Sequence, residues 1–243
     1  MHEYDGRPVS YGGGVNSTAL VVMLALEGWR GPIVFSDTGA EWPETMEYLD
    51  TFRAWLEQHN LTLTVLDGTW RRGKEQMTLI DYCEHYRVTP FPGARWCTSS
   101  WKVAPLHRWC EANGYDPAAM LIGISADEWH RQQDRDRPLV DRGIDRDGCA
   151  RIIADAGLPV PRKSGCWICP FQRDSMWREL HRMHPDLFER AARLEELSSE
   201  RRGEQAHLYP GGEVTLRQLA AGFEAQTEMF DWLDYYQPCM CRV

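Results

Sequence analysis

Three consecutive glycines near the start of the chain precede polar residues and then an apolar run. Glycine lets the backbone approach a ligand closely, and hydroxyl groups beside the free N–H groups of a helix start favour an anion such as phosphate. Neither the spaced G-x-G-x-x-G dinucleotide loop nor the Gly-Lys-Ser/Thr of a Walker loop is present. The pattern indicates another kind of phosphate loop, and a tight strand-to-helix turn without a ligand is the alternative. The residues of this loop are Gly12, Gly13, Gly14, Asn16, Ser17 and Thr18.

The cysteines are the second group of residues that can carry chemistry. Cys166 and Cys169 form a C-x-x-C, which fits a redox dithiol, half of a zinc site or half of an iron-sulfur site. Cys97 and Cys149 also stand in polar contexts, whereas Cys83 and Cys110 fall in helix-like stretches and are expected to be small buried side chains. A further pair, Cys239 and Cys241, lies in the tail. A C-x-C there suits persulfide transfer or disulfide resolution, or is an ordinary chain end.

Strands and helices alternate around the glycine loop. The pattern predicts strands over residues 7–11, 32–39 and 61–67, with helices over residues 18–27 and 43–60 between them. Strands separated by helices of this length imply a parallel sheet whose binding loops lie at the carboxyl ends of the strands. Both the glycine loop and the segment that begins at Asp37 fall on that edge.

The rest of the chain is predicted to be mainly helical. Helices are expected over residues 74–89, 102–114, 175–200 and 216–236, and a strand that runs into a polar loop over 119–131. Gly211 and Gly212 mark the break before the last helix. From about residue 131 to about residue 170 the chain is expected to be irregular, and metal ligation is one reason for such a long loop. We therefore expect a nucleotide-binding α/β domain at 1–148 and a cysteine-bearing loop with helices at 149–243.

Composition limits the possible functions. The 243 residues carry a net charge of −9, which argues against a broad basic face that grips nucleic acid, although a local basic pocket remains possible. The longest apolar stretch, residues 19–26, is far too short to span a bilayer, and the first residues lack the features of a signal peptide. We expect a cytoplasmic protein without a membrane partner.

Four motifs in order resemble one superfamily. "GGGVNS" (12–17) resembles the pyrophosphate loop S-G-G-x-D-S of the ATP pyrophosphatases, the PP-loop proteins. "DTGAEWPETMEYL" (37–49) looks like the D-T-G-x-x-F/W-P-E-T signature of the phosphoadenylyl-sulfate (PAPS) reductase branch. "RWCTSSWKVAPL" (95–106) and "GISADEWHR" (123–131) are similar to two further elements of that branch. The resemblance is closest in style to DNA phosphorothioation proteins of the Dnd and Ssp types and to phage-encoded PAPS reductase-like proteins.

The resemblance implies an α/β fold, a doubly wound parallel sheet of the adenine-nucleotide α-hydrolase (HUP) type with a helical C-terminal extension. It implies ATP on the glycine loop and on Asp37, Thr38 and Gly39, with Mg²⁺. By motif position, Lys102 and Arg131 would neutralise phosphate charge; Arg95 and Arg146 are weaker candidates for the same pocket. Asp127 and Glu128 can bind magnesium or a ribose hydroxyl, or simply start a helix.

Two residues depart from the family pattern, and both touch the phosphates. Gly12 stands at the usual serine, and Asn16 replaces the aspartate that helps to hold magnesium in such pyrophosphatases. An amide forms hydrogen bonds but brings no charge for the cation. Asp37 is then a candidate for the missing carboxylate.

The resemblance also implies a [4Fe-4S] cluster on Cys97, Cys149, Cys166 and Cys169. A zinc ion on the same four thiolates, or no metal, are the alternatives. Cys241 matches the position of the tail nucleophile in the reductases, although the family's E-C-G-L-H context is absent.

The function expected on this basis is ATP-dependent sulfur insertion. An acceptor oxygen is adenylylated with loss of pyrophosphate, and sulfur from a cysteine desulfurase displaces AMP. The acceptor is expected to be a nucleic acid presented by a partner protein, and a homo-oligomer is possible. The alternatives are a reductase of adenylyl sulfate or its 3′-phosphate that uses a tail cysteine, and a nucleotide-binding subunit that has lost turnover through Asn16.

Overall fold

The computed structural model describes residues 3–72, 75–131, 136–209 and 214–225. The chain divides into two compact units. We call the first the sheet unit, which covers Met1–Gly68 and Ser100–Gly165, and the second the helical unit, which covers Thr69–Ser99 and Cys166–Arg242. The division expected after residue 148 falls inside a helix, α7 (Arg146–Asp155), so Cys149 belongs to the sheet unit.

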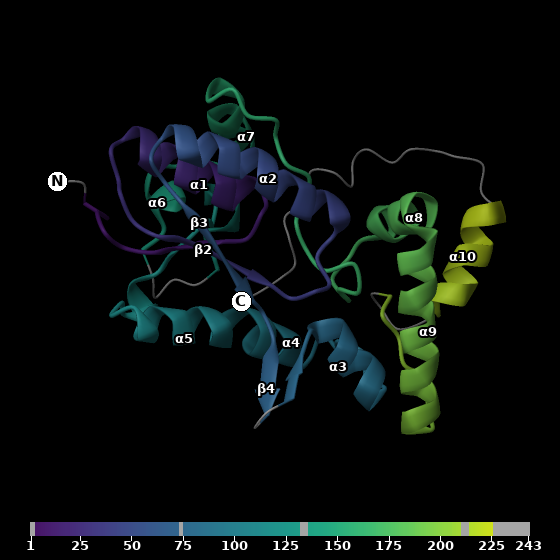
Figure 1. Ribbon diagram of the computed structural model, residues 1–243. Helices are drawn as coiled ribbons and strands as arrows, with labels where there is room; N and C mark the ends of the chain where they lie inside the picture. Colours follow the sequence, from purple (N-terminus) through teal and green to yellow (C-terminus); the bar gives the residue numbers. More distant parts are fainter. Residues whose placement is uncertain (1–2, 73–74, 132–135, 210–213, 226–243) are drawn as a thin grey trace. The chain divides into compact units, whose positions relative to one another are not determined.

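Parallel strands form the centre of the sheet unit, in the order β3-β2-β1-β6 (Figure 1). They are β1 (Val9–Tyr11), β2 (Ile33–Asp37), β3 (Leu63–Asp67) and β6 (Leu121–Ile122). Val9 of β1 pairs with Ile33 on one side and with Leu121 on the other. The chain thus builds outward from β1 to β3 and later returns to add β6 beside β1. Open α/β sheets bind ligands where the strand order reverses in this way, and here that point lies between β1 and β6.

Helices cover both faces of this sheet, which confirms the expected α/β fold (Figure 1). On one face lie α1 (Val15–Leu26), α2 (Pro43–Gln58) and α7, and on the other lies α5 (Ala104–Ala112). Helix α1 is buried on nearly all sides, as its apolar sequence requires. Shorter turns complete the unit: a π-helix η1 (Ser99–Val103), the 3₁₀ turns η2 (Pro117–Ala119) and η3 (Ala126–Glu128), and α6 (Pro138–Asp141).

The helical unit combines an antiparallel hairpin with packed helices. The hairpin pairs β4 (Trp70–Arg72) with β5 (Glu75–Met77). The helices are α3 (Leu79–Tyr86), α4 (Trp96–Thr98), α8 (Asp174–Met183), α9 (Pro185–Arg202) and α10 (Leu216–Ala225). Helix α9 packs against α8, α10 and α3. Glu195 of α9 is buried and accepts hydrogen bonds from the backbone N–H groups of Leu208 and Leu216, both at 2.7 Å.

Three expectations differ from the structure. The segment expected to be irregular contains α7, which Asp145 caps by accepting a hydrogen bond from Gly148 N–H at 2.7 Å. The helix expected over 74–89 begins only at Leu79, because the residues before it form the hairpin. The helix expected over 175–200 is two helices, since proline at 185 disfavours a helical conformation in the residue before it. Gly211, Gly212 and residues 226–236 lie outside the described residues.

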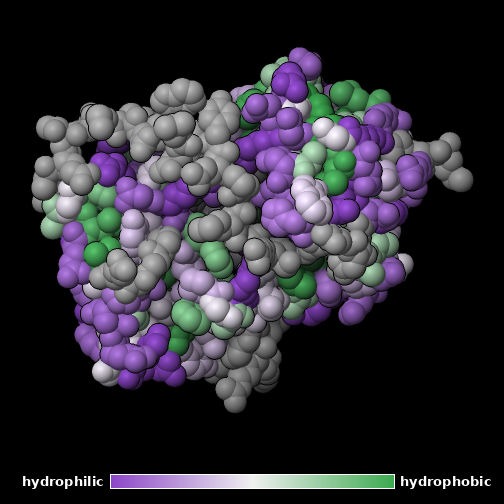
Figure 2. All heavy atoms as spheres, turned by 180° about the vertical axis from the view of Figure 1, so that it is seen from behind, coloured by the Kyte–Doolittle hydropathy of each residue, from purple (hydrophilic) through white to green (hydrophobic). Residues whose placement is uncertain are grey.

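Polar and charged residues cover most of the described surface on the face shown in Figure 2, where hydrophobic residues form small separate groups. Among the described residues, the large hydrophobic side chains that are exposed are Leu26, Phe91, Trp129, Val160 and Met183. In the described part of the chain, no helix is both long enough and apolar enough to cross a bilayer.

Candidate nucleotide-binding site

The glycine loop joins β1 to the start of α1. No side chain caps α1, and its first turn contains no acidic residue. Ser17 Oγ accepts a hydrogen bond from Gly12 N–H at 3.2 Å and donates one to Gly14 O at 3.1 Å. Thr18 Oγ1 also donates to Gly14 O, at 3.0 Å. These bonds shape the loop and leave the N-terminal N–H groups of α1 for an anion.

Two of the loop glycines lie close to other side chains, and the positive φ of Gly13 also favours glycine there. Gly13 has a φ of +70°, and a Cβ there would come within 2.7 Å of Thr45 Cγ2. A Cβ on Gly14 would lie 2.6 Å from Ser164 Oγ. By contrast, a Cβ on Gly12 would meet only Ser17 Oγ, at an ordinary 3.7 Å. Glycine at position 12, the departure from the family pattern, is therefore not imposed by this packing.

The segment after β6 packs directly on the same helix end. A Cβ on Gly123 would lie 2.6 Å from both the backbone N and the Cα of Ser17. Asn16 Nδ2 donates to Ser125 Oγ at 2.9 Å and to Glu128 Oε2 at 3.2 Å. Arg131 Nη1 pairs with the same Glu128 oxygen at 3.0 Å. Asn16, Glu128 and Arg131, which the sequence placed in two separate motifs, thus form one cluster at the point where the strand order reverses.

The carboxyl end of β2 forms the next side of the site. Thr38 Oγ1 donates to Glu41 Oε1 at 3.0 Å, and Lys102 Nζ pairs with that oxygen at 3.0 Å. Glu41 is almost completely buried, whereas the Lys102 side chain is 36% exposed and remains within reach of a ligand. Lys102 stands on the π-helix η1, a type of turn that is frequent at functional sites.

Asp37 is a half-buried carboxylate at the same edge. Its Oδ1 accepts a hydrogen bond from Gly39 N–H at 2.8 Å. Burial raises the pKa of Asp37 above its ordinary value; the Gly39 hydrogen bond and Lys102 oppose this rise, and the charges of Glu41 and Asp67 add to it. Asp67 is the register partner of Asp37 on β3. Paired carboxylates at neighbouring strand ends suit Mg²⁺, which prefers hard oxygen ligands.

Sequence reasoning missed several residues that border the glycine loop. Thr45 on α2 is 1% exposed, and its Oγ1 has no hydrogen-bond partner within the described structure. Ser164 lies over Gly14. Arg162, two residues earlier, stacks 3.9 Å from the Trp42 ring centroid and pairs with Glu44 at 3.1 Å. Thr45 ends the P-E-T motif and could have been found there, whereas nothing in the sequence around Ser164 indicated its place.

Cys149 is a core residue of the sheet unit. It lies on α7 with an exposure of 0%, within the same apolar cluster as α1 and α2. Burial raises the pKa of its thiol to about 12, and the charge of Asp127 adds to this effect. Cys149 is thus packed as a core side chain of this unit.

The other three cysteines of the expected cluster belong to the helical unit. Cys166 and Cys169 form a turn in which Cys169 N–H donates to Cys166 O at 3.0 Å. Arg95, two residues before Cys97, lies 5.5 Å from the ring centroid of Phe171, just after that turn. Within the described ranges, however, no three His, Cys, Asp or Glu side chains gather closely enough to hold a metal ion. The [4Fe-4S] cluster and the zinc ion on these four cysteines stay predictions.

The remaining candidates lie elsewhere. Arg146 begins α7, where its backbone N–H donates to Asp127 Oδ1 at 3.1 Å. Thus Asp127 helps to start this helix, which is the simpler of the two roles considered for it. Cys239 and Cys241 fall outside the described residues.

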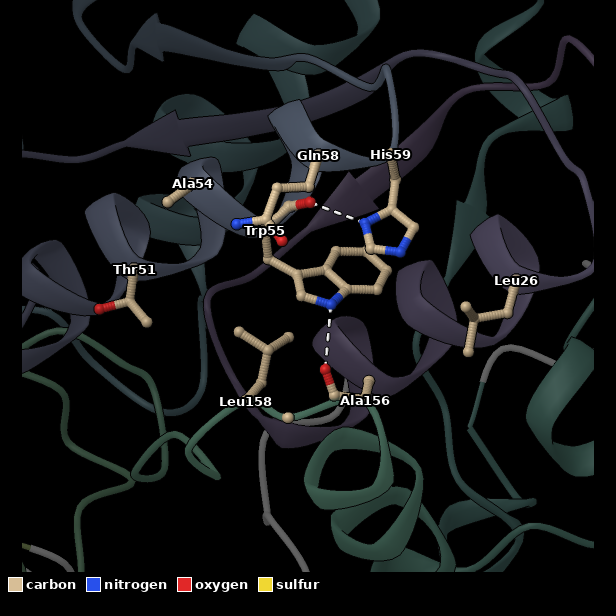
Figure 3. A pocket seen from close by; sticks show the side chains of 9 residues that line it. Leu26, Thr51, Ala54, Trp55, Gln58, His59, Ala156 and Leu158 are labelled. Atoms are coloured by element: carbon tan, nitrogen blue, oxygen red, sulfur yellow. Dashed lines mark hydrogen bonds between the residues drawn. The ribbon is translucent and has the colours of Figure 1, made fainter.

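A separate pocket of about 430 Å³ lies at the opposite ends of these helices (Figure 3). Leu26 ends α1, and Trp55 and His59 lie at the end of α2, with their rings stacked 3.8 Å apart. Trp55 Nε1 donates to Ala156 O, just after α7, at 3.1 Å. The glycine loop lies at the start of α1, so this pocket is distinct from the candidate site.

The comparisons with known proteins identify the family. The sequence profile of the phosphoadenosine phosphosulfate reductase domain matches residues 8–152, well over half of the chain. A search of curated proteins found no match. Among solved structures, the chain is similar to the crystal structure of phosphoadenylyl-sulfate (PAPS) reductase from Candida auris, a phosphate complex. The sequence identity is 16% and the TM-score 0.49, over 68% of this chain and 83% of that one. The matched segment contains the glycine loop, the Asp37 edge and the Gly123–Arg131 segment, and the chain belongs to the phosphoadenosine phosphosulfate reductase domain family.

Proposed function

We propose that this chain is an ATP pyrophosphatase that adenylylates an acceptor oxygen so that sulfur can be inserted. The observation that carries the proposal is the start of α1 at the glycine loop, which no side chain caps, at the reversal of strand order. A triphosphate placed there meets free backbone N–H groups, the Ser17 hydroxyl and no acidic side chain from the first turn of α1.

The residues around this loop supply what transfer of an adenylyl group needs. An acceptor oxygen attacks the α-phosphorus of ATP, and the bond to the bridging oxygen breaks so that pyrophosphate leaves with the electron pair. Lys102, held by Glu41, neutralises part of the phosphate charge. Asp37 and Asp67 would hold Mg²⁺, which when bound supplies further positive charge at the phosphates.

Sulfur would then replace the activated oxygen. A persulfide from a cysteine desulfurase attacks the adenylylated centre, AMP leaves with the oxygen, and a second thiol cleaves the S–S bond to leave a disulfide. Cys239 and Cys241 are candidates for carrying the persulfide and for supplying that second thiol. No step passes through an iron-sulfur cluster. The acceptor would be a nucleic acid, as in DNA phosphorothioation. Because the chain carries a net charge of −9, a partner protein would present this acceptor.

The family match favours a second candidate, a reductase of adenylyl sulfate or its 3′-phosphate that uses Cys241 and thioredoxin. One assay separates the two functions. The protein is incubated with ATP and Mg²⁺, with and without DNA, and AMP and pyrophosphate are measured; a parallel sample receives the sulfonucleotides with thioredoxin, and sulfite is measured. AMP and pyrophosphate in equal amounts support the proposal. Sulfite alone supports the reductase, and ATP binding without AMP indicates a subunit that has lost turnover.

A further inference from the structure

The amide of Asn16 stands where related loops carry a carboxylate, and it faces a buried carboxylate. Its Nδ2 lies 3.2 Å from Glu128 Oε2 and 2.9 Å from Ser125 Oγ. A carboxylate only accepts hydrogen bonds, so the nitrogen of the amide, and not its oxygen, must face Glu128. Glu128 is 4% exposed and Ser125 is fully buried. The interaction between Asn16 and Glu128 is therefore little screened by water.

The charges of this cluster balance only while residue 16 is neutral. Glu128 brings one negative charge, and Arg131, at 3.0 Å, brings one positive charge. An aspartate at position 16 would set a second carboxylate beside Glu128, lose both donated hydrogen bonds and leave the cluster with a net negative charge. Two carboxylates this close cannot both ionise without a large cost. That charge would also lie in the first turn of α1, where the phosphate must bind.

The two segments are in close contact through their backbones. Gly123 approaches Asn16 and Ser17 so closely that a single added Cβ would lie 2.6 to 2.7 Å from their backbone atoms. The Asn16 amide adds its two hydrogen bonds to this contact between the segment after β6 and the phosphate loop. Asn16 Oδ1, Glu128 Oε1 and Arg131 Nε are buried and have no partner among the described residues. These atoms leave the cluster one donor and two acceptors for water or a ligand.

We propose that Asn16 is a positioning residue matched to Glu128 and Arg131, and that the chain needs the amide rather than having lost an aspartate. Asn16 orients Glu128 and Arg131 and keeps the start of α1 free of negative charge. The second of these roles, which concerns nucleotide binding at the start of α1, rests on the proposed function. The pairing of Asn16 with Glu128 and Arg131 does not. The proposal implies that Asn16→Asp weakens the protein and its nucleotide site instead of restoring them.

The test is a double-mutant cycle that exchanges the amide and the carboxylate. Thermal unfolding without nucleotide is measured for wild type, Asn16→Asp, Glu128→Gln and the double variant Asn16→Asp/Glu128→Gln. We expect each single variant to lower the Tm by about 5 °C, the order expected for the loss of a buried polar pair in a chain of this size. The double variant restores one carboxylate and one amide, and it should recover at least half of that loss.

Asn60→Asp is the matched control, because Asn60 is exposed and its φ of 56° is also tolerated by aspartate. It adds the same charge and should leave the Tm within about 1 °C of wild type. Additive losses in the cycle, or an Asn16→Asp protein as stable as wild type, overturn the proposal. If Asn16→Asp does not fold, Ser125→Ala replaces it: this variant removes only an acceptor of the amide, and combining it with Glu128→Gln must give a less than additive loss.

Calorimetry with ATP and Mg²⁺ tests the role in nucleotide binding. Asn16→Asp should bind ATP about tenfold more weakly than wild type, and the double variant should recover part of that affinity. Tighter binding by Asn16→Asp overturns the positioning role. If wild type itself binds no ATP, the proposed function fails, while the unfolding cycle still decides whether Asn16 and Glu128 are coupled.

Discussion

Short motifs singled out both the phosphate-loop region and the cysteines, and the two groups are distributed differently between the units. The loop, the Asp37 edge and the Gly123–Arg131 segment meet within one unit, joined by backbone contacts and direct hydrogen bonds. Of the four expected cluster ligands, Cys149 is a core residue of the sheet unit, and the other three belong to the helical unit. The order of the motifs along the chain predicted which segments lie together where the sheet topology determines this. It did not predict that Cys149 packs in the core, because that depends on the face of α7 on which the side chain lies.

Among the variants that test this comparison, Gly123→Ala is expected to have the largest effect on stability and on ATP affinity. Its Cβ would collide with the backbone of Ser17, which cannot rotate away as a side chain can, so the cost is on the order of 3 kcal/mol. ATP affinity should fall by about tenfold or more as the loop shifts. Calorimetry and thermal unfolding measure both effects.

Gly12→Ala is the control for that variant. The added methyl would make only an ordinary 3.7 Å contact with Ser17 Oγ, so we expect a change within about 0.5 kcal/mol. Equal effects of the two substitutions would show that the close approach of Gly123 to α1 is not as described.

Lys102→Met comes next. Glu41 is 1% exposed and loses the lysine cation, and because Lys102 is 36% exposed, water reduces the cost to about 2 kcal/mol. The double variant Glu41→Gln/Lys102→Met should be more stable than Lys102→Met in urea unfolding. A lysine variant with unchanged stability and unchanged ATP binding would remove Lys102 from the site.

Cys149→Ala tests the interpretation of Cys149 as a core residue and not a metal ligand. Removing a buried sulfur leaves a small cavity, and we expect a loss of about 1 kcal/mol in the free energy of unfolding. If anaerobically purified wild type contains iron and labile sulfide, the variant should contain the same amounts. A selective loss of iron in Cys149→Ala would mean that Cys149 is a ligand after all.

The smallest expected effect concerns pH. Burial holds the pKa of Asp37 above its ordinary value of 3.8, so the folded protein binds this proton more tightly than the unfolded chain does. The stability that this group contributes is therefore present at low pH and is lost as the pH rises through the raised pKa. Asp37→Asn should gain stability relative to wild type across that window, as followed by Tm against pH.

Asp155→Asn, an exposed carboxylate on α7, is the control and should follow the wild-type profile. A profile for Asp37→Asn that is parallel to wild type would mean that Asp37 is not desolvated at this edge.

Most of the sheet unit could be predicted from sequence. The strands that contain Val9, Ile33 and Leu63 were expected at these positions, because apolar runs between amphipathic helices indicate a parallel sheet. Helix α7 was missed because arginine, aspartate and glycine obscured its apolar face. Cys149 and Ile153 are buried four residues apart on that face. That spacing was the available signal that Cys149 packs in the core.

The site could be predicted only in part. The loop and strand-end residues were predicted to lie at one edge of the sheet, since carboxyl ends of parallel strands share one edge. Glu41 and Ser164 were not found, because their roles depend on a buried ion pair and on a segment that passes over Gly14. Nor did the motifs show that the Asn16 amide contacts Glu128, more than 100 residues away along the chain.

Calorimetric titration of the full chain with ATP and Mg²⁺ tests the central claim most directly. The account predicts a measurable heat with one ATP per chain in wild type and in Gly12→Ala, and a much weaker response in Gly123→Ala. Absence of heat in folded wild type, or identical binding by Gly123→Ala, would contradict a nucleotide site at the start of α1.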